Sequence, residues 1–385
     1  MKIKSLLTIA LALTAAAYGQ AGAQDAKLKA CFIYVGPTGD IGWTYAHDQG
    51  RKAAEKALPW LETQYVENVP EGQALPAIDR LVKGGCKVVF TTSFGYMDDT
   101  LAAAKKYPDV IFAHNAGFKR NANMATYMAD FYQVYYLNGL VAGALSKSGK
   151  VGFVGTYPIP ELKRHLSAFA LGVKAANPKA NVNVKWINSW FDPAKTREAS
   201  EALLSEGADV LSSAEDSATG VQTAAAKNVP TFSHYNPMLK FGPEEVVTGH
   251  IVHWDKIYID FLTKVHDGTY TNKNLANVDY WWLLSKGAVE MGADMNMPFN
   301  AKFVPQLKAA KMVVGGKSIS VYDRVMSLDA TMQKGESFDP FTGPIKDRNG
   351  VLRVPAGKTM SIGDLNSMSW VVPGVVGQVA DEPKK

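Results

Sequence analysis

The chain alternates short apolar runs, rich in β-branched and aromatic residues, with longer amphipathic stretches, and glycine or proline separates them. The first apolar run covers residues 30–35, a glycine-rich loop covers 36–42, and a helical stretch is predicted from His47 onward. Strands that alternate with helices of ten or more residues are typical of parallel βαβ units. The pattern therefore predicts an α/β fold whose ligand binds beyond the carboxyl ends of the strands.

The second half of the chain begins the same pattern again. The stretch GKVGFVGTYPIPELKRHLSAFALGVKAANP is predicted to form a strand, a Pro/Gly loop and a helix, and TAAAKNVP matches LAAAKKYP of the first half. We therefore expect two doubly wound parallel-sheet lobes with a hinge and a ligand cleft between them. Residues 24–147 and about 254–290 would form the first lobe, and residues 148–253 the second. About 291–385 would be a C-terminal extension packed on the lobes.

The first 23 residues have the pattern of a secretory signal peptide. Lys2 and Lys4 precede an apolar run over residues 6–17, and Ala21-Gly22-Ala23 is a small-residue cleavage site. A lipid anchor would need a cysteine directly after the apolar run, whereas Cys31 lies well beyond it. No later run is long enough to span a bilayer. We expect a soluble protein exported to the periplasm.

Charge and cysteine content restrict the possible partners and indicate a possible disulfide. The full chain has 41 basic and 36 acidic residues, and loss of the signal peptide lowers this small excess, which is too weak to indicate nucleic-acid binding. Cys31 and Cys86 each begin an apolar run, and the first and third strands of a doubly wound sheet are neighbours. In an oxidising compartment this allows a disulfide, with two buried free thiols as the alternative.

Signatures of enzymes, metals and cofactors are weak. G-x-S-x-G, the P-loop and H-E-x-x-H are missing from the sequence, and Gly36-Pro37-Thr38-Gly39 lacks the spacing of a dinucleotide-binding loop. His250 and His253 do not have a tight ligand spacing, and no paired thiolates accompany them. We predict a protein without catalytic residues, metal or cofactor.

Aromatic residues gather in the loops that follow predicted strands, where core residues are not usually placed. Several polar side chains lie between them in the same loops. Aromatic rings that line a slot favour a planar partner, and polar groups at its edge suit a heterocycle with N–H and C=O groups. Packing between elements is the alternative for the rings, and a helix N-cap is the alternative for Asp216 or Ser217. The predicted ligand-binding residues are Trp43, Phe94, Trp190, Tyr235, Trp254, Trp282, Asp40, Asn115, Asp130, Asp216 and Ser217.

Long stretches of the chain resemble the basic membrane protein (BMP) family of ABC-transporter substrate-binding proteins. They include FIYVGPTGDIGWTYAHDQGRKAAEKAL, VVFTTSFGYMDDTLAAAKKYPDVIF, INSWFDPAKTREASEALLSEGADV and FDPFTGPIKDRNGVLRVPAGK, and the match covers roughly residues 28–375. The resemblance implies a type I periplasmic-binding-protein fold with three crossovers and a purine nucleoside or base as ligand, held between two aromatic rings.

Carried over by motif, Trp43 and Phe94 would belong to the first lobe, and Trp190 with Asp216-Ser217 to the second. Trp254 and Trp282 would lie near the crossovers. The chain departs from the family pattern at residues 130–135, 233–237 and 251–253, which fall in the predicted pocket and leave another planar, nitrogen-rich ligand open.

We therefore predict an exported, monomeric solute-binding protein that captures a small planar heterocycle and delivers it to ABC transporter permease subunits. The alternative from another class is an exported enzyme acting on a similar heterocycle, such as a nucleosidase or hydrolase. A third reading is a receptor ectodomain that binds another protein. No nucleic-acid or membrane partner is expected.

Overall fold

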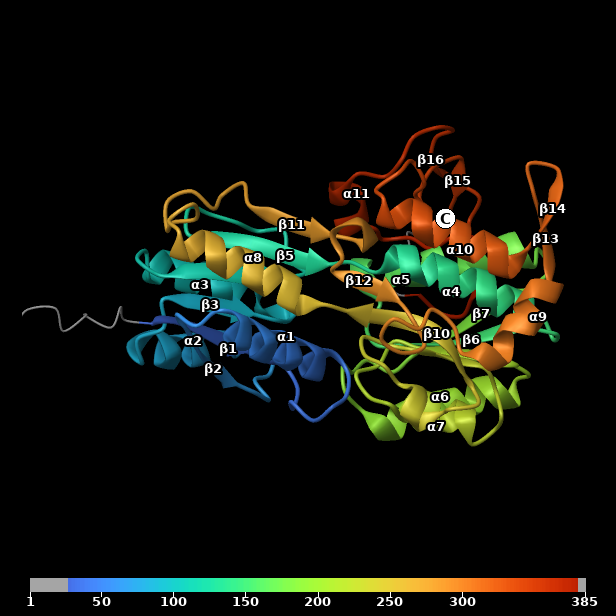
Figure 1. Ribbon diagram of the computed structural model, residues 1–385, viewed down its shortest axis with the longest axis horizontal. Helices are drawn as coiled ribbons and strands as arrows, with labels where there is room; N and C mark the ends of the chain where they lie inside the picture. The colour runs from blue at the N-terminus through green and yellow to red at the C-terminus, as the bar shows by residue number, and fades with distance from the viewer. Residues whose placement is uncertain (1–26, 380–385) are drawn as a thin grey trace, which may run out of the picture.

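A computed structural model describes residues 27–379, so the predicted signal peptide lies outside the described residues. Two lobes lie side by side along the long axis of the molecule (Figure 1). The first lobe contains a six-stranded sheet of order β11-β5-β4-β3-β1-β2, in which all neighbouring strands are parallel. Its strands are β1 (Leu28–Ile33), β2 (Leu61–Val66), β3 (Val88–Thr91), β4 (Ile111–Asn115), β5 (Met124–Ala129) and β11 (Asp279–Trp282).

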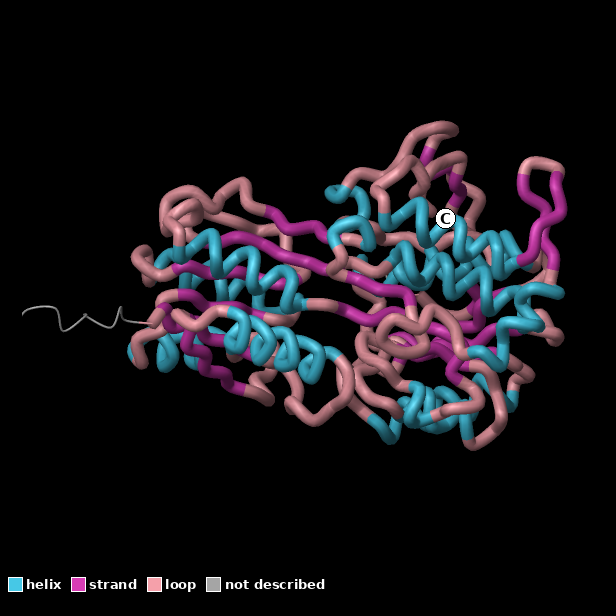
Figure 2. The backbone as a smooth tube through the Cα atoms, viewed as in Figure 1, coloured by secondary structure: helices cyan, strands magenta, loops and turns pink. Residues whose placement is uncertain are grey.

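Helices cover both faces of this sheet because neighbouring residues of β1 point to opposite sides, and residues 30–33 are all apolar and buried. Phe32 packs in one core cluster with α1 and α8, whereas Cys31 and Ile33 pack in another with α2 and α3. The strands run along the long axis of the molecule (Figure 2). The helices of this lobe are α1 (Trp43–Ala57), α2 (Ala74–Lys83), the 3-10 turn η1 (Phe94–Tyr96), α3 (Met97–Lys106) and α8 (Trp254–His266).

The second lobe repeats the design in a seven-stranded sheet of order β12-β10-β9-β8-β6-β7-β17. Only β12, which is antiparallel to β10, departs from parallel pairing. The series β7-β6-β8-β9-β10 matches β2-β1-β3-β4-β5 of the first lobe. The strands are β6 (Lys150–Gly155), β7 (Asn181–Trp186), β8 (Val210–Ser213), β9 (Thr231–Ser233), β10 (Val246–Val252), β12 (Val289–Met291) and β17 (Val375–Val376).

Helices flank the second sheet, and two of them pack backbone against backbone. A side chain at Gly139 would lie 2.1 Å from the carbonyl oxygen of Phe169, and one at Gly172 would lie 2.1 Å from that of Tyr136. Glycine is required at both positions because backbone atoms cannot move aside. The helices are α4 (Tyr132–Leu145), α5 (Pro160–Ala176), α6 (Pro193–Ser205) and α7 (Thr219–Ala225).

Within residues 27–379 the chain crosses between the lobes three times: between β5 and α4, between β10 and α8, and between β11 and β12. The sequence pattern predicts the two doubly wound lobes, and the family resemblance implies the three crossings. Over the same described range, no helix is both long enough and apolar enough to cross a bilayer.

The C-terminal part packs mainly on the second lobe, and its last strand, β17, joins that lobe's sheet beside β7. A hairpin of β13 and β14 projects from the molecule (Figure 1). The turn at Asn349-Gly350 joins two antiparallel strands, as its sequence predicts. The predicted domain boundaries stay a prediction. The elements are η2 (Leu239–Phe241), η3 (Leu284–Lys286), η4 (Ala301–Phe303), α9 (Val304–Ala309), β13 (Lys311–Val314), β14 (Lys317–Ser320), α10 (Val321–Gln333), β15 (Ile345–Lys346), β16 (Leu352–Val354) and α11 (Ile362–Asn366).

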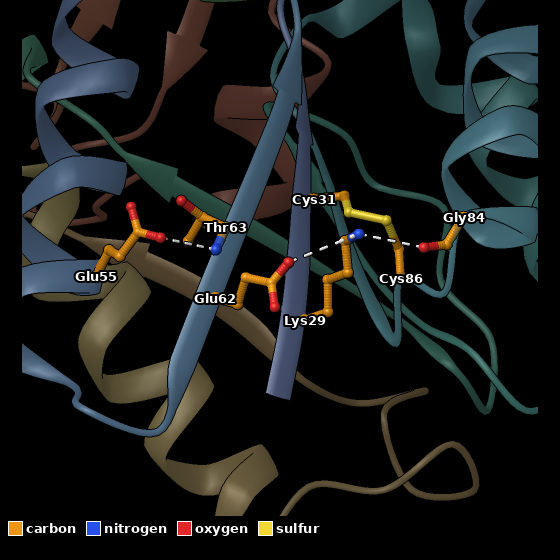
Figure 3. Close-up of a disulfide and its surroundings, with 7 residues drawn as sticks. All are labelled: Lys29, Cys31, Glu55, Glu62, Thr63, Gly84 and Cys86. Atoms are coloured by element: carbon orange, nitrogen blue, oxygen red, sulfur yellow. Dashed lines mark hydrogen bonds and ion pairs between the residues drawn. A yellow bond between two sulfur atoms is a disulfide. The ribbon is translucent and has the colours of Figure 1, made fainter. Parts of the chain in front are cut away.

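Cys31 of β1 and Cys86, just before β3, form a disulfide (Figure 3). The two strands are parallel neighbours, so the geometry that allows this bridge is present. Lys29 lies beside it and contacts Glu62 at 3.7 Å and the carbonyl oxygen of Gly84 at 3.2 Å. Two free thiols, the alternative left open by the sequence, are not what the structure contains.

One helix start differs from the prediction. The first helix begins at Trp43 rather than His47, so Trp43 and Tyr45 lie on its first turn and not in the preceding loop. The cause is Asp40, whose carboxylate accepts the backbone N–H groups of Gly42, Thr44 and Tyr45 at 2.8–3.1 Å. These bonds satisfy N–H groups that have no partner within the helix and extend the helix toward the loop.

Candidate functional site

A cavity lies between the two lobes, with an empty volume of about 310 Å³ when its mouth is counted. The part of this space that a water-sized molecule can occupy is only about 20 Å³. Five of the eleven predicted binding residues line it: Trp43, Phe94, Trp190, Asp216 and Tyr235. The other lining residues are Val35, Ser93, Ala116 and Glu161.

The topology explains why these residues meet. Phe94 follows β3, Trp190 follows β7, Asp216 follows β8 and Tyr235 follows β9. The carboxyl ends of parallel strands meet at one edge of a sheet, and in both lobes that edge faces the other lobe. Residues far apart in the sequence therefore come to one cavity from both sides.

The aromatic rings that line the cavity differ in how they are held: some are buried and fixed by protein contacts, whereas others are half-buried. Trp43 is 7% exposed, and its indole N–H donates to the carbonyl oxygen of Thr92 at 2.6 Å. Its ring packs edge-on against Tyr235 and Trp254, with centroids 5.2 Å away in each case. Protein contacts thus fix Trp43 in place.

Trp190 and Phe94 are only half-buried and come from opposite lobes. Trp190 packs against Tyr157 with ring centroids 4.9 Å apart, and its indole N–H has no partner among the described residues. Aromatic faces of this kind suit a planar ligand, because stacked rings prefer flat partners.

The two carboxyl groups of the cavity are the most informative polar groups. Asp216 is 3% exposed, and its Oδ1 has no hydrogen-bond partner within the described residues. Burial raises the pKa of Asp216 well above its ordinary value, and the carboxylates of Asp40, Glu215 and Glu161 add to the rise. A buried acceptor that lacks a donor is costly, so the cavity favours a ligand that supplies N–H groups.

Glu161 is the charged lining residue that sequence reasoning missed. It lies on the first turn of α5, directly after Pro160, and burial raises its pKa to about 7. Glu161 directly follows the Pro/Gly loop after β6, and because that loop follows a strand end, an acidic residue at this position was a usable signal. Among the described residues, no lysine or arginine lines the cavity, so the site does not supply a cation for a phosphate group.

Three of the other predicted residues lie beside the cavity without lining it. Two of them have hydrogen-bond partners in the protein, and the third is buried without one among the described residues. Asp40 holds the start of α1, and burial raises its pKa to about 6. Ser217 donates to Glu215 at 2.6 Å. Asn115 ends β4 next to Ala116, fully buried, and neither amide atom of its side chain has a partner among residues 27–379.

Asp130 lies at the crossing between β5 and α4. It pairs with Arg164 at 2.6 Å and His165 at 3.1 Å. Burial alone would raise the pKa of Asp130, but the guanidinium of Arg164 and the ring of His165 hold it below its ordinary value. The contacts of Asp130 with Arg164 and His165 join the first crossing to α5, and Asp130 does not line the cavity.

Trp254 and Trp282 also mark crossings, as the resemblance implies. Trp254 begins α8 and is fully buried, stacked on His47 at 4.1 Å between ring centroids. The backbone carbonyl of Trp282, at the end of β11, accepts the N–H of Asp130 at 2.9 Å. Neither ring lines the cavity, and a ligand contact for either stays a prediction.

In the described part of the chain, no group of three or more His, Cys, Asp or Glu side chains could hold a metal ion. Several histidines cluster near the crossings. His250 stacks on Phe131 at 4.4 Å, and burial lowers the pKa of both His250 and His234. Both rings are buried in the core of the second lobe.

Glu161→Gln should change the pH dependence of stability. Because the pKa of Glu161 is about 7 in the folded protein and its ordinary value is 4.5, the folded state binds this proton more tightly. The stability from the neutral carboxyl is complete below pH 4.5 and is lost as the pH rises through 7. Urea unfolding at pH 5 and pH 8 should show that the variant gains on the order of 2 kcal/mol relative to wild type at the higher pH.

The matched control is Glu198→Gln, an exposed glutamate of α6, which should leave the difference between the two pH values unchanged. Parallel pH profiles for wild type and Glu161→Gln would show that the Glu161 carboxyl is solvated in the folded protein.

The chain resembles known transport receptors over most of its length. A family model described as ABC transporter substrate-binding protein, PnrA-like, matches residues 27–324. A purine-binding protein of Brucella abortus (strain 2308) is 38% identical, over 93% of this chain and 95% of that protein. A Haloferax volcanii protein provisionally named as an ABC transporter glucose-binding protein is 35% identical, over 72% of this chain and 68% of that protein.

Solved structures agree on the fold. A solute-binding protein of an ABC transporter system from Aeropyrum pernix K1 matches with a TM-score of 0.66 and 16% identity, covering 88% of this chain and 96% of that one. One from Conexibacter woesei matches with a TM-score of 0.60 and 24% identity, covering 81% and 98%. The predicted fold, with two doubly wound lobes, is confirmed. The chain belongs to the Bmp family of PnrA-like ABC transporter substrate-binding proteins.

Proposed function

We propose that the protein is a periplasmic receptor that closes over a planar heterocycle rich in N–H donors and delivers it to the permease of an ABC transporter. A purine base with an exocyclic amino group, such as adenine, is the favoured ligand. The observation that carries the proposal is the buried Oδ1 of Asp216, which has no partner among the described residues and belongs to a cavity walled by aromatic rings from both lobes.

Three features support this ligand class. Trp190 and Phe94 offer ring faces from opposite lobes, which suits a flat molecule. Asp216 and Glu161 accept hydrogen bonds and disfavour anions. The phosphates of a nucleotide would find no cation among the described lining residues, which favours a base or a nucleoside. The purine-binding relative from Brucella abortus supports the same choice.

Transport rather than catalysis is proposed because the relatives are named as binding proteins and the cavity shows no paired nucleophile and base among its described lining residues. Incubation of the protein with adenosine, followed by chromatography, should release no free adenine. Steady release of adenine would favour the nucleosidase alternative.

Trp190→Ala should weaken adenine binding by about 1–3 kcal/mol, the value of one lost stack between a base and an aromatic ring. Calorimetric titration of adenine into wild type and variant measures the difference. The matched control is Phe191→Ala, because Phe191 is the next residue, is 39% exposed and does not line the cavity. That variant should bind adenine as wild type does.

Glucose is titrated in parallel, since one relative carries that name. Binding of glucose and not adenine would overturn the purine assignment and leave the receptor role. Equal affinity for adenine in wild type and Trp190→Ala would show that this ring is not a wall of the binding site.

A further inference from the structure

The two lobes touch through a pair of loops beside the cavity. Asn236, in the loop after β9, donates from its side-chain amide to the carbonyl oxygens of Ile41 at 3.0 Å and Gly42 at 2.8 Å. Asn236 is 7% exposed, and its acceptors belong to the loop before α1 in the other lobe. These bonds exist only while the lobes are closed, so the structure is that of the closed form.

The close approach of the two lobes also requires glycine at position 42. A side chain there would place its Cβ 2.4 Å from the backbone carbonyl carbon and oxygen of Asp216, in the second lobe. Backbone atoms cannot move aside as a flexible side chain can. Gly39 lies in the same loop, and a Cβ added there would have no atom within 4 Å, so this position offers a matched comparison.

The backbone on each side of this contact is in an unusual conformation. Ile41 has φ of 67° and Tyr235 has φ of 63°, values that β-branched and aromatic residues rarely adopt. Such conformations persist only where surrounding contacts hold them. Tyr235 lines the cavity, and the carbonyl oxygen of Ile41 accepts a hydrogen bond from Asn236, so a residue in a rare conformation lies on each side of the lobe contact.

We infer that Asn236 is a positioning residue that latches the closed form without touching the ligand, and that Gly42 is the site that this latch requires. Asn236 lines an outer groove between the lobes, together with Tyr45 and Trp254, and does not line the cavity. The inference rests on the proposed function in one respect: a ligand in the cavity would favour closure, and the latch would then slow ligand release.

The test follows adenine binding by stopped-flow tryptophan fluorescence in wild type, Asn236→Leu, Gly42→Ala and Gly39→Ala. Asn236→Leu removes two hydrogen bonds but keeps the approximate side-chain size, so the release rate should rise about tenfold with little change in the association rate. Gly42→Ala should raise the release rate at least as much, because its Cβ keeps the lobes apart. Gly39→Ala should match wild type.

Small-angle X-ray scattering of the same proteins separates the latch from the choice of ligand. Without ligand, Asn236→Leu and Gly42→Ala should have a larger radius of gyration than wild type, and Gly39→Ala should not. If adenine fails to bind wild type but this difference is found, the proposed ligand is wrong and the latch holds.

Equal release rates or, where adenine does not bind, equal radii of gyration in wild type, Asn236→Leu and Gly42→Ala would overturn the latch. Circular dichroism melting checks that each variant is folded, and Asn236→Ala replaces Asn236→Leu if the leucine prevents folding.

Discussion

Asp216→Asn is expected to reduce the affinity for adenine about a hundredfold. The Oδ1 atom of Asp216 is buried in the cavity without a partner from the described residues, so a ligand N–H would be its donor. A buried polar group that loses its hydrogen-bond partner costs about 1–3 kcal/mol, and an amide that turns its own N–H toward the ligand adds repulsion. Calorimetric titration of adenine into the variant measures the loss.

The stability of the ligand-free variant separates binding from folding. Because burial raises the pKa of Asp216, its charge destabilises the folded protein at neutral pH. Asp216→Asn should therefore melt at the same temperature as wild type or higher, even though it binds adenine poorly. The control is Asp267→Asn, an exposed position at the end of α8, which should bind normally. Unchanged adenine affinity in Asp216→Asn would leave Asp216 with a structural role alone.

Replacement of both Cys31 and Cys86 by serine should lower the free energy of unfolding by roughly 4 kcal/mol, the value that the chain-entropy relation gives for a loop of this length. The bridge joins positions 55 residues apart, so the unfolded chain loses a large amount of conformational freedom when it is closed. Urea unfolding of wild type and of the double variant measures the difference.

Adenine affinity should survive this change wherever the double variant is folded, because the bridge lies among the residues of α2 and α3 and not at the cavity. Reduction of the wild-type protein should reproduce the loss of stability. Equal unfolding midpoints for oxidised and reduced wild-type protein would contradict the prediction.

The fold could be predicted because local pattern and overall topology agree. The pattern predicts the helix over residues 74–83 with the bounds that the structure has, and β9 likewise at residues 231–233. The pattern predicts no strand between residues 117 and 131, yet β5 lies there. Its residues are buried on both faces and give no alternation. Short strands such as β12 and β17 form because they pair with strands that are distant in the sequence, so the local pattern cannot place them.

The site could be predicted only in part, for a related reason. A strand-end rule finds Phe94, Trp190, Asp216 and Tyr235, all of which line the cavity. The rule cannot tell which polar side chains are already satisfied by the protein. Asp130, for example, is paired with Arg164 and His165 at a crossing, a contact between distant segments that the sequence does not reveal.

The position of β17 has a consequence for assembly. The last described strand of the chain pairs with β7 through Val375 and Val376 and so covers the outer edge of the second sheet. An uncovered edge presents free N–H and C=O groups that another polypeptide can extend by strand addition. Because β17 occupies the backbone groups of β7 at this edge, a strand from another polypeptide cannot pair with β7 while the tail stays in place.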